Sequence, residues 1–523
     1  MAKIISVEQA VDLIRDGMTV GVSGFGAFSS PDSILEAIGQ RYRERRTPKD
    51  LTIVSGVAPG DFQEDGCGMS KIAYDGLVQT MIASHLRMSP PMGRAVSENR
   101  VAAFSLPLGV YGQLLSAIGG GRPGVVTHVG LNTYADPTQE GCCINPKAKA
   151  QGRTFVERVR LDGRDYLFYR AFPIDACLLH ASYGDELGNI SVQEEPIRGE
   201  LVELAAAVHN RGGIVIVEVN DIVKAGTLDP RHILIHRSYV DYLVKAQGGS
   251  NVALGHHPEL TGQLRVPTQD RIRAIPLSAK KVIARRAALE LRPQMLVNLG
   301  IGIPASVANI ANEEGIHDQL TLSLETGVYG GVPLDGPLFG SSMNPESLSR
   351  SADMFVAYDG GGLDLTVLGA AEVDSSGNVN VSRFAGRCVG PGGFVDISQN
   401  TPKVCFAFSF TSGQQRLAVE GGRLVIQQDG SGIKFKGRAD QITFSAQYAR
   451  QTGQQVLFIT ERAVFALQDQ GLTLVEIAPG VDLERDILAK MEFQPAISPA
   501  LRPMDPRLFQ PQPLGLAAAF QSG

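Results

Sequence analysis

The chain has 523 residues, of which 43% are hydrophobic and 20% are charged, and its formal net charge is −6. A single hydrophobic core stops growing at roughly 250 to 300 residues, so this length predicts more than one domain. The negative charge argues against nucleic acid or an anionic membrane as a partner. Because no apolar stretch reaches the roughly 20 residues that span a bilayer and no secretory signal opens the sequence, we expect a cytoplasmic protein.

Several catalytic signatures are missing. The sequence lacks the G-x-x-x-x-G-K-[ST] phosphate loop, the G-x-S-x-G elbow and the H-E-x-x-H zinc motif, which argues against an ATP-driven ligase, that type of serine hydrolase and a zinc protease. The nine histidines show no ligand spacing, so we predict no metal site. The six cysteines are too sparse for a disulfide framework. We expect a reducing compartment and a loop without redox role at Cys142-Cys143.

The first half opens with short β-branched runs that alternate with amphipathic stretches. Residues 18–22 predict a strand that runs into Ser23-Gly24-Phe25-Gly26, after which Ser30 is an expected N-cap and Pro31 the first helical residue. Residues 50–56 and 213–219 predict two more strands. Between them, residues 185–190 contain a Gly-Asn pair that predicts a turn between strands.

The second half repeats this plan. Residues 295–299 predict a strand that runs into Gly300-Ile301-Gly302, and Pro304 then opens a helix. Residues 319–325 match 50–56, residues 374–379 match the Gly-Asn turn, and residues 403–408 match the strand at 213–219. The alternation predicts an α/β fold of two similar, mainly parallel, open sheets that arose by internal duplication.

The domain boundaries follow from this internal similarity. We predict an N-terminal domain over 1–246, a linker over 247–277 and a C-terminal domain over 278–523. The linker lacks sustained periodicity and contains Gly-Gly-Ser and His-His-Pro. Ser278 is the expected N-cap of a helix over 279–291.

The two halves differ where the matched strand at 50–56 ends. The first half ends it with Ser55-Gly56, whereas the second half has Glu325 before the Gly-rich turn that holds Gly327, Gly330 and Gly331. A strand-end carboxylate of this kind fits a helix cap or an ion pair with an arginine as well as it fits a catalytic group. The spacing alone leaves these interpretations open.

A dinucleotide site is a different interpretation of the same residues. Gly300-x-Gly302-x-x-Ala305 follows a predicted strand and opens a helix, as in the dinucleotide-binding fingerprint. Glu325 lies 20 residues after Ala305, where that fingerprint wants an acid for the ribose. On this interpretation the protein is an NAD-dependent oxidoreductase that uses Gly300, Gly302 and Glu325.

Two more Gly-rich segments lie in the second half, at 360–362 and 390–393. Such segments fit either tight turns or loops that aim backbone N–H groups at an anion or a developing oxyanion. Their presence in the same half as Glu325 favours a site there.

An ordered set of motifs runs nearly end to end: Ser23-Gly24-Phe25-Gly26, residues 129–137, residues 209–215, Asn298-Leu299-Gly300-Ile301-Gly302-Ile303-Pro304, Glu325-Thr326-Gly327, Phe339-Gly340-Ser341-Ser342-Met343-Asn344-Pro345, residues 359–364, residues 459–465 and residues 476–482. In this set the chain resembles the family I CoA-transferases, in particular the fused short-chain acyl-CoA:acetate or propionate CoA-transferases.

The resemblance implies a transferase that moves CoA from a short-chain acyl-CoA to a carboxylate such as acetate. It places the nucleophile, which carries a glutamyl-CoA thioester, on Glu325, and backbone oxyanion donors on Gly392 and Gly393. Because a free glutamate has a pKa near 4.3, we expect Glu325 to be ionised at neutral pH without a helper base. Substrate- or CoA-binding positions are expected at Gly24, Gly26, Gly300, Gly302, Gly327, Asn344, Gly361 and Gly362.

The resemblance also sets the expected partners. CoA is a dissociable substrate beside small carboxylic acids, and no permanently bound cofactor, metal or ATP is expected, because the energy of the thioester is conserved. We expect a homo-oligomer, either a dimer or a tetramer. An acyl-CoA hydrolase that uses the same Glu325, the NAD-dependent oxidoreductase and a non-catalytic acyl-CoA sensor stay as alternatives.

This sequence departs from the family pattern at two places. Relatives often carry Pro-Gln-Gly where this chain has Pro107-Leu108-Gly109, and Gly-Gly-Lys where it has Gly141-Cys142-Cys143. A lost amide and a lost cation change which acid is accepted rather than the type of reaction.

Overall fold

The structure is a computed structural model that describes residues 2–248, 255–268 and 274–521, so the linker positions 249–254 and 269–273 lie outside the described residues. The chain divides into two compact units. The first comprises Met1–Val266, Leu324–Val356 and Ala385–Asp396; the second comprises Pro267–Ser323, Ala357–Phe384 and Ile397–Gly523. The chain passes between the units several times. The boundaries at 1–246 and 278–523, which follow the repeat, stay a prediction.

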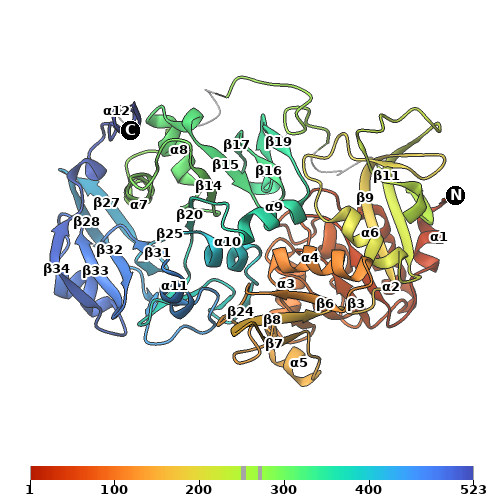
Figure 1. Cartoon of the computed structure of the whole chain (residues 1–523), viewed down its shortest axis with the longest axis horizontal. Helices are drawn as coiled ribbons and strands as arrows, with labels where there is room; N and C mark the ends of the chain where they lie inside the picture. Colours follow the sequence, from red (N-terminus) through yellow and green to blue (C-terminus); the bar gives the residue numbers. More distant parts are fainter. Residues whose placement is uncertain (1, 249–254, 269–273, 522–523) are drawn as a thin grey trace. The chain divides into compact units, whose positions relative to one another are not determined.

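The first unit is built on a parallel sheet (Figure 1). Its strand order is β1-β13-β11-β9-β2-β3-β4-β5, and all these neighbours run parallel. Their bounds are β1 Lys3–Ile5, β13 Tyr242–Lys245, β11 Ile214–Val223, β9 Ala176–Asp185, β2 Thr19–Val22, β3 Leu51–Val54, β4 Val78–Ile82 and β5 Ala102–Phe104. The central strands are almost continuously buried, as expected for a parallel sheet covered on both faces.

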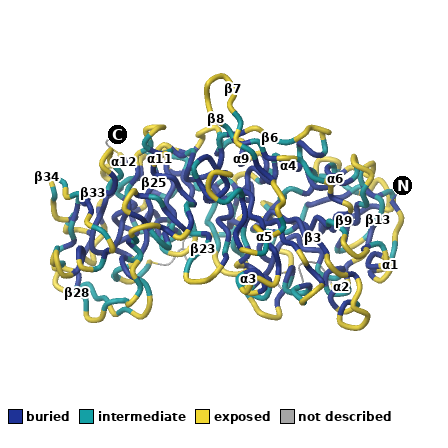
Figure 2. The backbone as a smooth tube through the Cα atoms, turned by 90° about the horizontal axis from the view of Figure 1, so that it is seen from below, coloured by how far each residue is buried: buried dark blue, intermediate teal, exposed yellow. Residues whose placement is uncertain are grey.

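Helices of the first unit bury one apolar stripe each. In α2 the buried residues Ile34, Leu35, Ile38 and Tyr42 recur with the helical period. The bounds are α1 Val7–Asp12, α2 Asp32–Arg45, α3 Pro90–Ser97, α4 Leu108–Gly119, α5 Pro146–Ala150 and α6 Leu201–His209. Helices α4 and α6 pack against each other. A separate sheet contains β6 Gly124–Thr127, β7 Val156–Leu161 and β8 Arg164–Arg170, and the tip of the β7–β8 hairpin is exposed (Figure 2).

The start of α2 differs from the prediction by one residue. Pro31 occupies the N-cap position, and Ser30 does not cap the helix. The hydroxyl of Ser30 instead donates to the Asp32 carboxylate at 2.8 Å. In contrast, the predicted cap of α7 (Ala279–Ala288) is confirmed, because the Ser278 hydroxyl accepts from the Lys281 N–H. This helix ends at Ala288 rather than at residue 291.

The second unit has its own sheet in the order β15-β14-β20-β25-β31-β32-β33-β34. The strands are β15 Thr321–Leu324, β14 Leu296–Leu299, β20 Leu365–Leu368, β25 Lys403–Ala407, β31 Gln455–Ile459, β32 Ala463–Gln468, β33 Gly471–Ile477 and β34 Ala496–Pro503. The helices within this unit are α7, α8 Ser306–Glu313, α11 Ala446–Thr452 and α12 Leu516–Gln521; α9 Ser351–Asp359 and α10 Phe394–Asn400 lie where the chain changes unit. One apolar core joins α7 and α8 to β14, β20 and β25.

The two sheets share one topology, which confirms the predicted mainly parallel α/β fold. The order β13-β11-β9-β2-β3 of the first unit corresponds to β31-β25-β20-β14-β15 of the second. The residue registers also agree, since Val20 pairs with Ile53 in β2–β3 and Val297 pairs with Leu322 in β14–β15. This register places Glu325 at the position equivalent to Gly56.

The two predicted Gly-Asn turns have the same hydrogen bonds. Asp185 Oδ2 accepts from the Asn189 amide at 2.9 Å, and Asp374 Oδ2 accepts from the Asn378 amide at 3.0 Å. The other carboxylate oxygen of each aspartate accepts two backbone N–H groups. The glycine of each turn has a positive φ, 100° in Gly188 and 89° in Gly377, which is why glycine is required there.

Candidate active site

Glu325 directly follows β15 and starts the turn into β16 (Val328–Tyr329). The turn requires Gly327, whose φ is +100°, because a Cβ there would lie 2.2 Å from the Ser349 carbonyl oxygen. The Ser351 hydroxyl donates to the backbone carbonyl of Glu325 at 3.1 Å, and the Thr326 hydroxyl donates to the Gly340 carbonyl at 2.6 Å. These bonds fix the backbone that carries the Glu325 side chain.

The side chain of Glu325 meets the Gly-rich loop at 390–393. The Gly393 N–H donates to Glu325 Oε2 at 3.0 Å. A Cβ on Gly393 would lie 2.0 Å from the same oxygen, so only glycine allows the backbone this close. An N–H at this place is suited to stabilise negative charge on oxygens bound to the Glu325 carboxyl carbon.

The segment 84–86 holds that loop in place. The Gly392 N–H donates to the Ser84 carbonyl at 2.9 Å, and the Leu86 N–H donates to the Val389 carbonyl at 2.8 Å. His85 Nδ1 lies 2.9 Å from the Gly390 carbonyl oxygen. Burial lowers the pKa of His85 to about 4, so the ring is neutral at pH 7 and Nδ1 carries the donated hydrogen. Gly392 thus anchors the turn that aims the Gly393 N–H.

The environment changes the acidity of Glu325. Its pKa is raised to about 7: burial is the largest cause, the Gly393 hydrogen bond opposes it, and the negative charge of Glu200 adds to it. A free-peptide pKa neglects burial, so Glu325 is less readily ionised than the sequence alone suggests, and its ionisation at neutral pH stays a prediction.

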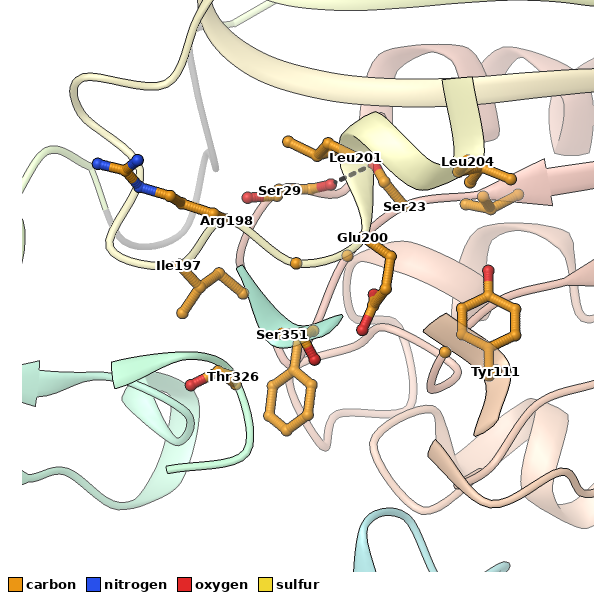
Figure 3. Close-up of a pocket in the computed structure, with 15 residues that line it drawn as sticks. Ser23, Ser29, Tyr111, Ile197, Arg198, Glu200, Leu201, Leu204, Thr326 and Ser351 are labelled. Atoms are coloured by element: carbon orange, nitrogen blue, oxygen red, sulfur yellow. Dashed lines mark hydrogen bonds between the residues drawn. The ribbon is translucent and has the colours of Figure 1, made fainter. Parts of the chain in front are cut away.

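A cavity opens beside the Glu325 turn, within the first unit (Figure 3). It encloses about 440 Å³ of space, its open mouth included. Thr326 and Ser351 reach it from the Glu325 side. Much of the rest of the wall is apolar: Val22, Phe25, Ile197, Leu201 and Leu204. Glu325 itself is not among the lining residues, so the cavity adjoins the turn that carries Glu325.

The sequence analysis missed Glu200, whose carboxyl group projects toward this cavity (Figure 3). The pKa of Glu200 is raised to about 7, mainly by burial, and the nearby Ser351 side chain opposes the shift. Glu200 is the N-cap residue of α6, where an acid is ordinary. No sequence signal therefore distinguished it from a helix cap.

The other predicted residues of the first unit have different surroundings. Gly24 lines the cavity, with a φ of +128°. The Gly26 N–H faces the Met88 sulfur at 3.3 Å. Asn344 uses its side chain on the backbone of Val266, accepting from its N–H at 3.0 Å and donating to its carbonyl at 2.7 Å. Asn344 therefore holds the segment that ends at Val266 in place. Its side-chain amide is used in these two hydrogen bonds with Val266 and makes none with Glu325.

Four predicted glycines belong to the second unit. Gly300 donates its N–H to the Val367 carbonyl at 2.8 Å, and Gly302 has a φ of +81°. Gly361 and Gly362 end α9 by donating to the carbonyls of Tyr358 and Ala357. Their predicted role in binding CoA stays a prediction.

The two departures from the family pattern have different locations. Leu108 is buried at the start of α4, and its Cδ1 would lie 3.1 Å from a Cβ on Gly56, which lines the cavity. Cys142 and Cys143 are buried, and burial raises the pKa of both thiols. Among the residues that the structure describes, no His, Cys, Asp and Glu group could hold a metal ion, and no helix is long and apolar enough to cross a bilayer.

Comparison with known proteins identifies the family. Residues 4–246 match the family model described as coenzyme A transferase. The caffeate CoA-transferase of Acetobacterium woodii is 41% identical over 518 residues, which cover 97% of this chain and 98% of that protein. The chain therefore belongs to the coenzyme A transferase family and is a transferase, as predicted. The NAD-dependent oxidoreductase is set aside.

Two further similarities concern one protein. The acetate CoA-transferase YdiF of Escherichia coli strain K12 is 36% identical over 513 residues, covering 97% of this chain and 95% of that protein. The crystal structure of the YdiF apoenzyme from E. coli O157:H7 superposes with a TM-score of 0.92 at 35% identity, covering 98% and 97% of the two chains. A structure of YdiF described as a thioester complex with CoA gives a TM-score of 0.91.

Proposed function

We propose that the enzyme transfers CoA from a short-chain acyl-CoA to a carboxylate acceptor such as acetate, through a glutamyl-CoA thioester on Glu325. The observation that carries this proposal is the Glu325 carboxyl group, which lies at a strand end beside a small cavity and accepts the Gly393 N–H at 3.0 Å. The thioester complex described for YdiF supports the covalent route.

The first half-reaction makes the enzyme thioester. An ionised Glu325 oxygen attacks the acyl carbon of the donor, the C–S bond breaks, and CoA leaves as thiolate from a mixed anhydride. The thiolate then attacks the Glu325 carboxyl carbon, and the C–O bond breaks to release the donor acid as carboxylate. The acceptor carboxylate attacks the glutamyl thioester and reverses both steps. No net proton, ATP or metal enters this balance.

The surroundings of Glu325 meet the needs of these steps. The Gly393 N–H lies where negative charge develops on the tetrahedral intermediates, and one such donor contributes about 2.7–4 kcal/mol. The Gly392 N–H does not fit the predicted role of an oxyanion donor, because it donates to the Ser84 carbonyl. The burial that raises the pKa of Glu325 also limits hydration of the anhydride, so that water does not compete with CoA.

The test is to trap the intermediate. The enzyme is incubated with acyl-CoA without acceptor, reduced with borohydride and digested, and the peptide with residues 321–331 is analysed by mass spectrometry. Reduction of the thioester should convert Glu325 to the alcohol and abolish activity, whereas Glu325→Gln should give no adduct and no transfer. Rapid transfer with an unmodified Glu325 would contradict the proposal, as would turnover by Glu325→Gln once deamidation is excluded.

The acceptor decides between transferase and hydrolase. With acetate present, the proposal expects acetyl-CoA in amounts equal to the donor consumed. Free CoA in its place would support the acyl-CoA hydrolase. A screen of short-chain donors and acceptors then defines the acid pair, which the names of the relatives, caffeate and acetate CoA-transferase, leave open.

We also propose a homo-oligomer, dimer or tetramer, in a reducing cytoplasm. The family resemblance supports the oligomer, and the six free cysteines support the compartment. Light scattering tests the first proposal, and a monomer at micromolar concentration would contradict it.

A further inference from the structure

Glu200 is a half-buried acid to which the proposed transfer reaction gives no role. It is the only acidic side chain among the residues that line the cavity beside Glu325. Its carboxylate packs close to Gly56 and Tyr111, since a Cβ on Gly56 would lie 3.3 Å from Glu200 Oε2 and from a Tyr111 ring carbon. The absence of a side chain at Gly56 thus leaves room for this carboxyl group.

Ser351 connects Glu200 to the Glu325 turn. The Ser351 hydroxyl donates to the Glu325 backbone carbonyl at 3.1 Å, and the Ser351 side chain lies close enough to Glu200 to lower the pKa of its carboxyl group. The charge of Glu200 acts on the Glu325 carboxyl group directly. An acyl group attached to the Glu325 carboxyl group and extending into this cavity would therefore point its far end toward Glu200.

Among the described residues, the cavity wall carries one positive charge, and that charge does not face Glu200. Arg198 is the only cation among its lining residues, and its guanidinium group points away from Glu200 (Figure 3). Glu203, one turn along α6, lies outside the cavity lining and is ion-paired with Arg350 at 2.8 Å. Leu108, at the position where relatives often carry an amide, contributes only an apolar surface beside Gly56.

We propose that Glu200 is a specificity-determining residue, which admits acyl groups without a second charge to the cavity and rejects acyl groups that end in a carboxylate. A second carboxylate would be brought against a like charge in a partly dehydrated cavity whose one lining cation, Arg198, points away from Glu200, and this is strongly unfavourable. This inference rests on the proposed function, because it assumes that the acyl group bonded to Glu325 occupies the cavity.

The test compares three acceptors of similar length: propionate, malonate and malonamate. Malonamate has nearly the shape of malonate but an uncharged amide at its far end, so the pair separates charge from size. Acyl-CoA products are measured by mass spectrometry at about pH 8, above the pKa of about 7 of Glu200. The variants are Glu200→Gln and, as a matched control, Glu203→Gln. Glu203 lies outside the cavity lining. In the Glu203→Gln variant its ion-pair partner, Arg350, would still be paired with Asp353.

In the wild-type enzyme we expect kcat/KM for malonate to be at least about 30-fold below that for malonamate, because two carboxylates face each other. Glu200→Gln should raise the malonate to malonamate ratio by about tenfold or more, and Glu203→Gln should leave it within about threefold. A purely structural role for Glu200 would change all three acceptors by the same factor.

Two results would overturn the inference. One is a wild-type enzyme that uses malonate as well as malonamate, and this measurement needs no variant to fold. The other is a folded Glu200→Gln enzyme, checked by circular dichroism, that keeps the wild-type ratio. Failure of the proposed function is recognised separately, since it would remove the adduct on Glu325 whatever the acceptor ratios are.

Discussion

Gly56 and Glu325 occupy equivalent positions in the two halves of the chain, and they differ in every chemical respect. Both follow a strand that pairs in the same register, β3 on β2 and β15 on β14. At the first position the side chain is absent, and Leu108, Glu200 and Tyr111 fill the space around it. At the second position a carboxyl group emerges and accepts the Gly393 N–H. The scaffold thus provides two equivalent strand ends, of which one lines the cavity and the other carries the carboxyl group that we propose to react.

The position of the proposed nucleophile, Glu325, also depends on the absence of a side chain at Gly393, which faces it. Glu325 approaches the backbone at Gly393 so closely that a methyl group there would overlap its oxygen. Substitutions on the two sides of this contact test the comparison most directly.

Gly393→Ala should have the largest effect. The new Cβ would lie 2.0 Å from Glu325 Oε2, so the carboxyl group and the N–H must separate. We expect kcat to fall by about 10²–10³, the loss seen when one oxyanion donor is removed. Steady-state kinetics with acetate as acceptor provide the measurement.

A matched control for this variant is Gly437→Ala, at an exposed glycine with no atom within 4 Å of the added Cβ. It should keep wild-type activity. A Gly393→Ala enzyme as active as this control would show that the N–H of Gly393 contributes nothing to the reaction.

The pH dependence comes next in size. Because the pKa of Glu325 is raised to about 7, the protonated and unreactive form gains population as the pH falls. We expect kcat/KM to decrease about tenfold from pH 8 to pH 6. Since the charge of Glu200 contributes to the raised pKa, Glu200→Gln should move the midpoint to lower pH. A flat profile down to pH 5 would contradict the assigned pKa.

Gly56→Ala tests the other side of the comparison. Its Cβ would lie 3.1 Å from Leu108 Cδ1 and 3.3 Å from Glu200 Oε2, so it narrows the cavity without touching Glu325. We expect kcat/KM for butyrate to fall about fivefold relative to acetate, since a pocket of changed size discriminates by chain length. An equal loss for both acids would indicate a general distortion instead.

The smallest effect on activity is expected at the paired turns. Asp185→Ala and Asp374→Ala each remove the same set of hydrogen bonds, one in each unit. Each should lower the free energy of unfolding of its own unit by about 1–3 kcal/mol and leave kcat/KM within about twofold. Denaturant titrations of the two variants test this expectation, and unequal losses would show that the turns are not equivalent.

Features with local causes could be predicted from the sequence. The Asp185 and Asp374 turns and the Ser278 cap depend on hydrogen bonds between residues a few positions apart, and the pattern identifies them. Ser30 shows the limit of this reasoning. It was predicted to cap α2, but its hydroxyl donates to the Asp32 carboxylate instead. Glu325 stood out because the duplicated half lacks an acid at the equivalent position and because the family resemblance places the nucleophile there.

Features that depend on tertiary contacts could not be predicted in this way. The raised pKa values of Glu325 and Glu200 come from burial by distant segments, which no spacing in the sequence records. Glu200 lies 125 residues before Glu325 in the chain but acts on the same carboxyl group. The hydrogen bond from the Gly392 N–H to the Ser84 carbonyl likewise joins segments that are far apart in the sequence.

The interleaving of the two compact units has a consequence for recombination. A cut after Val266 leaves Glu325 and Gly393 on the later fragment, although both belong to the first unit together with Glu200. Neither fragment alone should fold into an active half, and function would return only when both are co-expressed. A chimera of two relatives joined at that point would take Glu200 from one parent and Glu325 from the other.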